Sequence, residues 1–244
     1  MPRPLAVRAA RDAVQIVAPE AVGLVTDLNA NPAKFLSTKY LALRTVRKEI
    51  ITLALIKLAT SDTDAAIEQL KGKWAPQLTA EERNWIWGVI GKQAANRLSD
   101  AAPGYYANVT RDTDLNDDML AWKVRAALRQ GQWPAVLEAT RAMSEEGRAD
   151  QAWAYWRARA LLTGIPPAQR ALLEAGTTTD AGAAPPRHRA EYQEARQLLE
   201  SIASPRGFYE QLALEELGQR IPLPPKPAAP TAAEKEAARQ NAGL

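Results

Sequence analysis

Residues 120–133 read LAWKVRAALRQGQW, and residues 151–164 read QAWAYWRARALLTG. In both stretches a tryptophan, Trp122 or Trp156, is followed directly by a cation and two positions later by an arginine, and leucine and glycine follow. Apart from these cations, residues 119–128 and 152–162 are apolar. A helix that is apolar nearly all round has to be covered on several sides. The repeated phrase therefore predicts two equivalent helices, each packed against its neighbours along the chain.

The repeat extends beyond these two stretches. Trp87, Trp122 and Trp156 lie 35 and 34 residues apart, and Tyr209 begins a fourth, similar phrase. More amphipathic segments, such as residues 134–146, alternate with the apolar ones. A period in the mid-thirties with two helices per unit is typical of a helical-hairpin solenoid. We therefore predict an all-α fold, a right-handed superhelix of stacked α-hairpins that is TPR-like and U- or ring-shaped.

Polar residues mark where several of these helices begin. Ser61 is the expected N-cap of the helix that starts at residue 62, and Thr79 with Glu82 forms a predicted capping box. Asn116 is the expected cap of the helix that carries the first tryptophan phrase.

Glycines mark the ends of the two tryptophan helices. Gly131 and Gly164 follow them at the positions where a left-handed residue commonly ends a helix. After Gly131, two residues suffice as a turn before Pro134, which a first helical turn tolerates.

The sequence divides into three parts. Residues 1–42 form an N-terminal helical segment, and residues 43–220 form the helical-hairpin domain with an insertion loop at 165–189. A short helix at residues 169–174 is expected within that loop. Residues 221–244 read as a strap rich in proline and alanine, at the start of a further domain. Thr231 and Glu234 are expected to start a weak helix there, after the strap.

Composition excludes several functions. The chain has 244 residues, 46% of them apolar, with a net charge of +3 from 31 basic and 28 acidic residues and no cysteine. This charge is too small to indicate nucleic-acid binding, and without cysteine there is no disulfide or thiolate metal site. Residues 1–60 hold nine Lys or Arg against four Asp or Glu, which favours a solvated helix face over a binding strip. There is no apolar run of 18 residues, so no membrane span is predicted.

The sequence offers no catalytic, cofactor or metal site. His188 is the only histidine and lies between two arginines, so a surface loop position is expected. We recognise no Ser-His-Asp triad around it, one histidine without cysteine is too few for a His-containing metal cluster, and phosphate-binding glycine motifs are absent. The acidic pairs at 81–82 and 117–118 begin helices, where the helix dipole explains them, and those at 145–146 and 215–216 fall on predicted exposed faces.

The cations of the repeated phrase are the candidate binding residues. Lys123 aligns with Arg157, and Arg125 aligns with Arg159. Equivalent positions of a solenoid stack into ladders, so these four side chains could form a basic ladder that faces an anionic polymer. The alternative is structural: the cations pair with carboxylates such as Glu138 or Glu145, or cover tryptophan with their stems.

Residues 78–97, 115–143, 152–164 and 195–218 together resemble the helical superhelix of the soluble lytic murein transglycosylases. The resemblance covers roughly residues 43–220 and rests on the order of several phrases, including residues 156–161 and 207–213. The long insertion and the basic N-terminus depart from the family pattern. The family is periplasmic and cleaves the MurNAc–GlcNAc bond of peptidoglycan to a 1,6-anhydro product. It needs no metal and uses one glutamate in a C-terminal lysozyme-like domain.

The resemblance implies that the catalytic domain is missing here. The family's glutamate stands in a Glu-Ser motif that a Gly-Leu-Met-Gln phrase follows. The sequence has Glu200-Ser201 but no Gly-Leu-Met-Gln, so we interpret Glu200 as a surface residue of a repeat helix. The N-terminus also lacks a secretory signal, because Arg8, Arg11 and Asp12 interrupt its apolar residues. We therefore expect a piece of a longer periplasmic protein.

The hypothesis is a non-catalytic superhelical domain of such an enzyme, inactive alone. Its expected partners are peptidoglycan glycan strands and the missing catalytic domain, with cell-wall synthesis proteins as further candidates and no nucleic acid. One alternative is a TPR-like scaffold for protein–protein interaction. Another is a stand-alone hydrolase with an unrecognised site.

Overall fold

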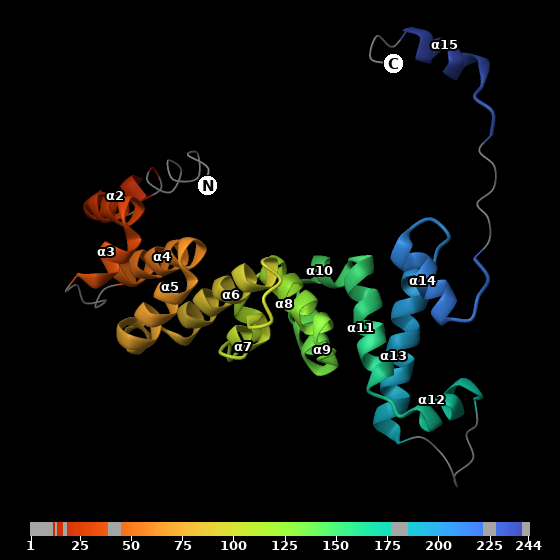
Figure 1. Cartoon of the computed structure of the whole chain (residues 1–244). Coiled ribbons are helices and arrows are strands. Elements are labelled where there is room, and N and C mark those ends of the chain that lie inside the picture. Colours follow the sequence, from red (N-terminus) through yellow and green to blue (C-terminus); the bar gives the residue numbers. More distant parts are fainter. Residues whose placement is uncertain are drawn as a thin grey trace.

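The computed structural model describes residues 12, 14–16, 19–38, 45–176, 185–221 and 228–240. Within these ranges the regular structure is helical throughout and contains no strand, which confirms the predicted all-α fold (Figure 1). None of the helices in the described ranges is long and apolar enough to cross a membrane. The right-handed twist and the U or ring shape stay predictions.

The helices follow one another with short connections. In chain order they are η1 (Pro19–Ala21), α2 (Val22–Ala30), α3 (Pro32–Ser37), α4 (Thr45–Ser61), α5 (Thr63–Gln69), the π-helical η2 (Leu70–Trp74), η3 (Ala75–Gln77), α6 (Ala80–Asn96), α7 (Ala102–Tyr106), η4 (Asp112–Asp114), α8 (Asp117–Arg129), α9 (Trp133–Ala142), α10 (Glu145–Ala149), α11 (Gln151–Thr163), α12 (Pro167–Glu174), α13 (Pro186–Ile202), α14 (Phe208–Glu216) and α15 (Ala232–Gln240).

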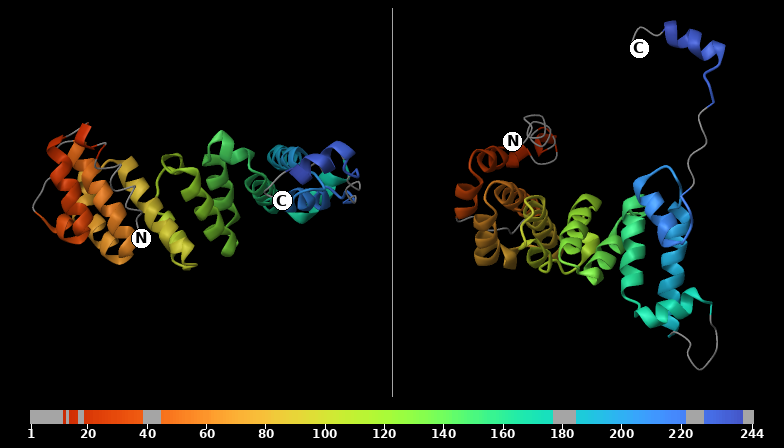
Figure 2. Two further views of the ribbon diagram at one scale, coloured as in Figure 1. Left: turned by 90° about the horizontal axis from the view of Figure 1, so that it is seen from above. Right: turned by 45° about the vertical axis from the view of Figure 1, so that its right-hand side comes forward.

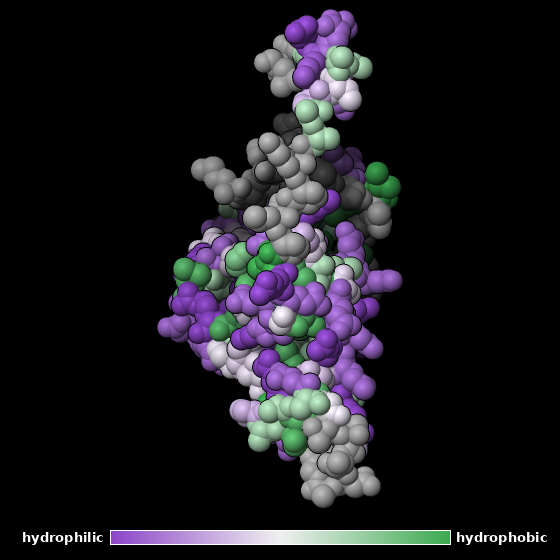
Figure 3. All heavy atoms as spheres, turned by 90° about the vertical axis from the view of Figure 1, so that its right-hand side faces the viewer, coloured by the Kyte–Doolittle hydropathy of each residue, from purple (hydrophilic) through white to green (hydrophobic). Residues whose placement is uncertain are grey.

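Consecutive helices pair and the pairs stack in chain order. We call α4, α6, α8, α11 and α14 the first helices; the second helices α5, α7, α9 and α13 pack on the first four of them. Neighbouring pairs also contact each other along the row. Helix α6 packs on α4 and α8, and α11 packs on α9 and α14. Figures 1 and 2 show the resulting elongated row, from which α15 stands apart, and Figure 3 shows hydrophilic and hydrophobic residues interspersed on the face at one end of the row.

The first helices are covered on nearly all sides. Residues 86–91 of α6 are consecutive and all buried, and residues 152–162 of α11 include no exposed side chain. The apolar core has two clusters: one runs from η1 to α9 and includes Ala160 of α11, and the other is formed by α11, α13 and α14. Leu137 and Trp156 pack against both clusters and so join them.

Three first helices end in the same left-handed turn. Leu98, Gly131 and Gly218 have φ values of 57°, 65° and 69°. In each case the next residue donates its N–H to the carbonyl five residues back, as at Gln132 to Ala127 (3.0 Å). This 6→1 hydrogen bond is the Schellman motif, which satisfies a free carbonyl at the helix end. α6, α8 and α14 therefore end in the same way.

Gly164 does not take the predicted left-handed conformation. Its φ is −71°, and its N–H bonds to the carbonyls of Ala160 and Leu161 at 3.2 Å. The chain leaves α11 directly towards α12 instead of folding back as it does after α8. The inserted segment therefore changes how α11 ends.

The insertion is more helical than expected. The predicted short helix is present as α12, but α13 begins at Pro186, inside the predicted loop. His188 consequently lies in the first turn of a helix, and its Nδ1 is hydrogen-bonded to Gln169 of α12. Residues 177–184 of the insertion lie outside the described residues.

The helix starts agree with the sequence with one exception. The Thr79–Glu82 capping box and the Asn116 cap are both present. At α5 the cap is Asp62 rather than Ser61, because the Asp62 carboxylate accepts the N–H of Ala65 at 3.0 Å. The Ser61 hydroxyl bonds back to a carbonyl of α4 instead.

The tail agrees with the sequence where the structure describes it. Thr231 and Glu234 form the expected reciprocal hydrogen bonds at the start of α15, whose residues are all exposed. Of the predicted strap before this helix, residues 222–227 lie outside the described residues.

A buried polar network holds the loop between α7 and α8. Asn84 of α6 is 2% exposed; it donates to Asp114 at 2.7 Å and accepts from the N–H of Thr110 at 3.0 Å. Asp114 also accepts from Arg111 at 2.6 Å. The hydrogen bond from Arg111 lowers the pKa of Asp114, with a further contribution from Asn84.

Leu98 is expected to destabilise the fold locally. A non-glycine residue in the left-handed region costs about 1–2 kcal/mol, and Leu98 is 61% exposed, so its side chain contributes little in return. Leu98→Gly should therefore raise the free energy of unfolding by about 0.5–1 kcal/mol in urea denaturation. The matched substitution Gly131→Leu should lower it by about 1 kcal/mol. A destabilised Leu98→Gly variant would contradict this explanation of the turn.

The Asp114 network predicts a pH dependence. Asp114→Ala should cost about 1–3 kcal/mol at pH 7, because Asn84 and Arg111 lose an acceptor. The folded-state pKa of Asp114 is depressed, so its contribution is complete above the unfolded value of about 3.9 and disappears as pH falls through the folded value. The stability difference between wild type and variant should narrow below about pH 4. The exposed Asp100, paired only with surface groups, supplies the control: Asp100→Ala should show no such difference.

Candidate binding surface

Lys123 and Arg157 each directly follow the tryptophan of the repeated phrase, and each binds a carboxylate outside its own helix. Lys123 of α8 donates to Asp112 of η4 at 2.6 Å, and Arg157 of α11 donates to Glu194 of α13 through Nε at 3.0 Å. Their side chains are only 13% and 21% exposed. Both cations therefore have a carboxylate partner and are half-buried.

Arg125 and Arg159 point instead towards the next first helix. The guanidinium of Arg125 lies 4.9 Å from the ring centre of Trp122 and 5.0 Å from that of Trp153 on α11. Arg159 pairs with Glu216 of α14. Arg125 and Arg159 thus each contact the following first helix. Arg125 does so through a tryptophan ring, and Arg159 does so through an ion pair.

Three of the four cations pair with carboxylates, and Arg125 lies over tryptophan rings. The acceptors are Asp112, Glu194 and Glu216 rather than Glu138 or Glu145. Glu216 was expected on an exposed face, but its side chain is 15% exposed because arginines of α11 and α12 cover it. These carboxylates lie more than ten residues from their partners, so helical spacing alone could not identify them. Arg125 is the member of the ladder that is exposed.

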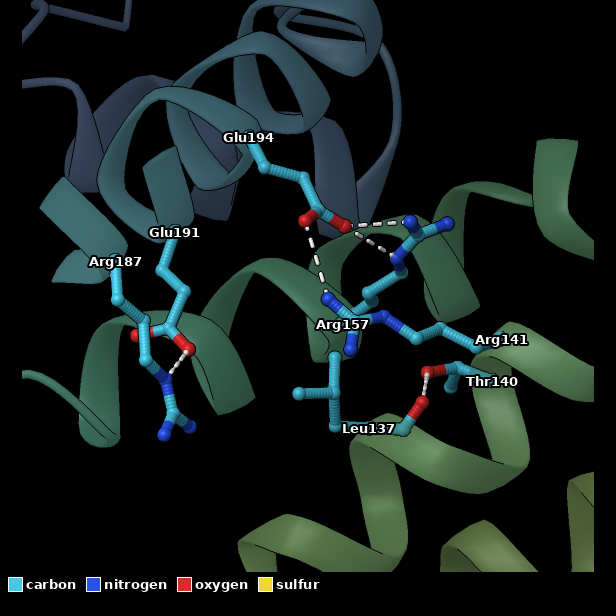
Figure 4. Close-up of polar contacts among 7 residues, drawn as sticks. All are labelled: Leu137, Thr140, Arg141, Arg157, Arg187, Glu191 and Glu194. Carbon is cyan, nitrogen blue, oxygen red and sulfur yellow. Dashed lines mark hydrogen bonds and ion pairs between the residues drawn. The ribbon is translucent and has the colours of Figure 1, made fainter. Parts of the chain in front are cut away.

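Glu194 connects three helices (Figure 4). One carboxylate oxygen accepts from Arg157 of α11, and the other accepts from Arg141 of α9 at 3.2 Å. The neighbouring pair Arg187 and Glu191 stays within α13, at 2.8 Å. Glu194, Arg141 and Arg157, which we call the Glu194 cluster, therefore connect the α11–α13 hairpin to α9 of the preceding hairpin.

A cleft of about 300 Å³ opens between α7, α8 and α9. Tyr106, Lys123, Gln132 and Glu138 are among its lining residues. The hydroxyl of Tyr106 donates to the carbonyl of Met119 at 2.9 Å. Burial raises the pKa of Tyr106, and the charges of nearby aspartates raise it further. Tyr106 is therefore a neutral structural donor rather than an acid–base group.

An aromatic cluster lies where α11 meets α14. Trp156 contacts Trp133 of α9 at 6.5 Å and Tyr209 of α14 at 6.4 Å between ring centres. Tyr209 also contacts Tyr155 at 5.6 Å and Phe208 at 5.2 Å. The sequence phrase identified residues 207–213 as part of the repeat but gave no sign that this end of α14 carries an exposed ring.

The residues considered for chemistry do not assemble into a site. Glu200 is on α13, exposed, and accepts from Arg196 of the same helix at 3.1 Å, as expected of a surface residue. Across the described ranges no three His, Cys, Asp or Glu side chains are grouped so as to hold a metal ion. Asp117 accepts from the N–H of Ser144 at 2.8 Å, and Asp118 pairs with Lys92 of α6. Asp118 thus connects α8 to the preceding hairpin, whereas Asp117 holds the start of α10 against the start of α8.

Comparison with known proteins finds similarity among solved structures. No protein-family model matches the sequence, and a search of the curated proteins finds no match. The chain is similar to the structure of an inactive mutant of the lytic transglycosylase Slt from Pseudomonas aeruginosa, with a TM-score of 0.55 and 23% sequence identity. The similarity covers 88% of this chain and 33% of that chain, so the chain spans about a third of the neighbour's length. At this identity the likeness shows a shared helical fold.

Removal of the Glu194 carboxylate should weaken the contact between α9, α11 and α13. Glu194→Ala leaves two half-exposed arginines without their acceptor and should lower the free energy of unfolding by about 1 kcal/mol. Glu200→Ala removes an exposed pair on the same helix and should change it by less than about 0.5 kcal/mol. Equal changes in the free energy of unfolding, measured by urea denaturation, would show that the three-helix contact stabilises the fold no more than an exposed ion pair does.

Proposed function

We propose that the chain is a non-catalytic superhelical domain of a lytic-transglycosylase-type protein that acts on peptidoglycan in the periplasm. The observation that carries the proposal is the fold shared with Slt over 88% of the chain. The tryptophan phrases at residues 120–133 and 151–164 support it, because they form equivalent stacked helices in the structure. The division into residues 1–42, 43–220 with an insertion loop at 165–189, and 221–244 belongs to the same proposal.

The role of such a domain is architectural. Its long row of hairpins offers an extended surface, while the catalytic residues of the parent protein lie in another domain. Peptidoglycan glycan strands and that catalytic domain are the proposed partners, with cell-wall synthesis proteins as further candidates. We also propose that the basic ladder of Lys123, Arg125, Arg157 and Arg159 faces the polymer. This part of the proposal depends most on Arg125, because its side chain is exposed.

The second candidate function is a TPR-like scaffold that binds a protein segment. The cleft between α7, α8 and α9 favours it, since grooves between helical hairpins can accept a peptide. Affinity for cell-wall polymer distinguishes the two candidates.

Incubation with purified murein sacculi tests the proposal. The chain should sediment with sacculi, should not sediment with cellulose, and should produce no clearing in a murein zymogram. Equal recovery with both polymers would favour the protein-binding scaffold, and clearing would contradict the non-catalytic role.

Arg125→Ala tests the ladder within the same assay. It should reduce the fraction bound to sacculi severalfold, because an exposed cation is lost. Arg129→Ala, at another exposed arginine of α8, is the matched control and should leave the bound fraction unchanged. Equal retention of both variants and wild type would show that the ladder does not contact the polymer.

A further inference from the structure

Phe208 is exposed in a way that core packing does not explain. It begins α14 and is 72% exposed, whereas Ala213 and Leu214 of the same helix are buried. Single exposed apolar residues are common and need no explanation by themselves. Phe208 differs because its ring continues a packed aromatic cluster outwards to the surface.

The cluster holds the Phe208 ring from behind. Phe208 meets Tyr209 edge to face, at 5.2 Å and 76° between ring planes. Tyr209 is fixed in turn by Tyr155 at 5.6 Å and by Trp156 at 6.4 Å. An aromatic surface supported in this way loses little conformational entropy when a ligand stacks on it.

Polar groups lie beside Tyr209, the ring that the exposed Phe208 contacts. A cleft of about 460 Å³ is lined by residues 149–152 and by Tyr209, within the range of about 300–1,000 Å³ typical of ligand sites. The amide of Gln151 donates to the carboxylate of Glu210 at 2.8 Å and so fixes both groups. Asp150 uses one carboxylate oxygen to cap α11 at 2.9 Å, and its other oxygen can accept from a ligand.

This combination suits a saccharide ring. A pyranose has an apolar C–H face that packs on an aromatic ring, and hydroxyl groups at its edge that donate to carboxylates and accept from amides. An anionic polymer fits less well, because Asp150 and Glu210 are acidic. We propose that Phe208 and Tyr209, with Asp150, Gln151 and Glu210, form a binding subsite for an uncharged sugar ring at the α11–α14 junction. The choice of an amino sugar as ligand rests on the proposed function.

Titration with chitotetraose, the β-1,4-linked tetramer of N-acetylglucosamine, tests the subsite. NMR spectra of the full chain should show shifts concentrated at residues 149–152 and 207–210. Phe208→Ala should weaken the affinity about tenfold, the loss typical of truncating an aromatic anchor. Phe208→Tyr retains the ring and should bind within about threefold of wild type. Leu53→Ala removes another exposed apolar side chain, 44% exposed on α4, and should not change the affinity.

The outcomes separate this subsite from the proposed function. Unchanged affinity in a folded Phe208→Ala variant, or no binding of the tetramer to wild type, would overturn the subsite. If the same wild-type protein still sediments with sacculi, the proposed function stands without the subsite. Tetramer binding that depends on Phe208 supports the subsite even if sacculi are not retained.

Discussion

Residues 82–95 of α6 and 152–162 of α11 include no exposed side chain, and the remaining structure depends on the cover that these first helices need. Because an α-helix has 3.6 residues per turn, six consecutive buried residues in α6, at positions 86–91, mean that it is enclosed on every side. A single partner helix cannot provide this cover. Each first helix therefore needs its own second helix and the hairpins before and after it, which is why the pairs stack in a row.

Polar contacts then fix how neighbouring pairs meet. The joint between the two core clusters carries Leu137 and Trp156 in its apolar part and the Glu194 cluster at its surface. Half-exposed ion pairs contribute little free energy compared with the burial of tryptophan and leucine. The ion pairs are better understood as selecting one arrangement of α9, α11 and α13 from several that would bury similar apolar area.

The all-α fold class, the pairing of consecutive helices and most helix starts could be predicted from the sequence, because apolar periodicity and capping are local properties. It was wrong at Gly164, where an insertion redirects the chain, and at Ser61, where the next residue is the better acceptor. It could not identify Leu98 as the equivalent of Gly131, since leucine is rarely left-handed. The partners of the four cations and the exposure of Phe208 depend on contacts between distant segments, which one sequence does not reveal.

Native-state hydrogen exchange of a Trp156→Ala variant tests the stacking account most directly. Trp156 packs against both core clusters, so its loss should lower the protection of amides in α9, α13 and α14 together with α11. A loss of protection confined to α11 would contradict the account, because the hairpins would then be stable without one another.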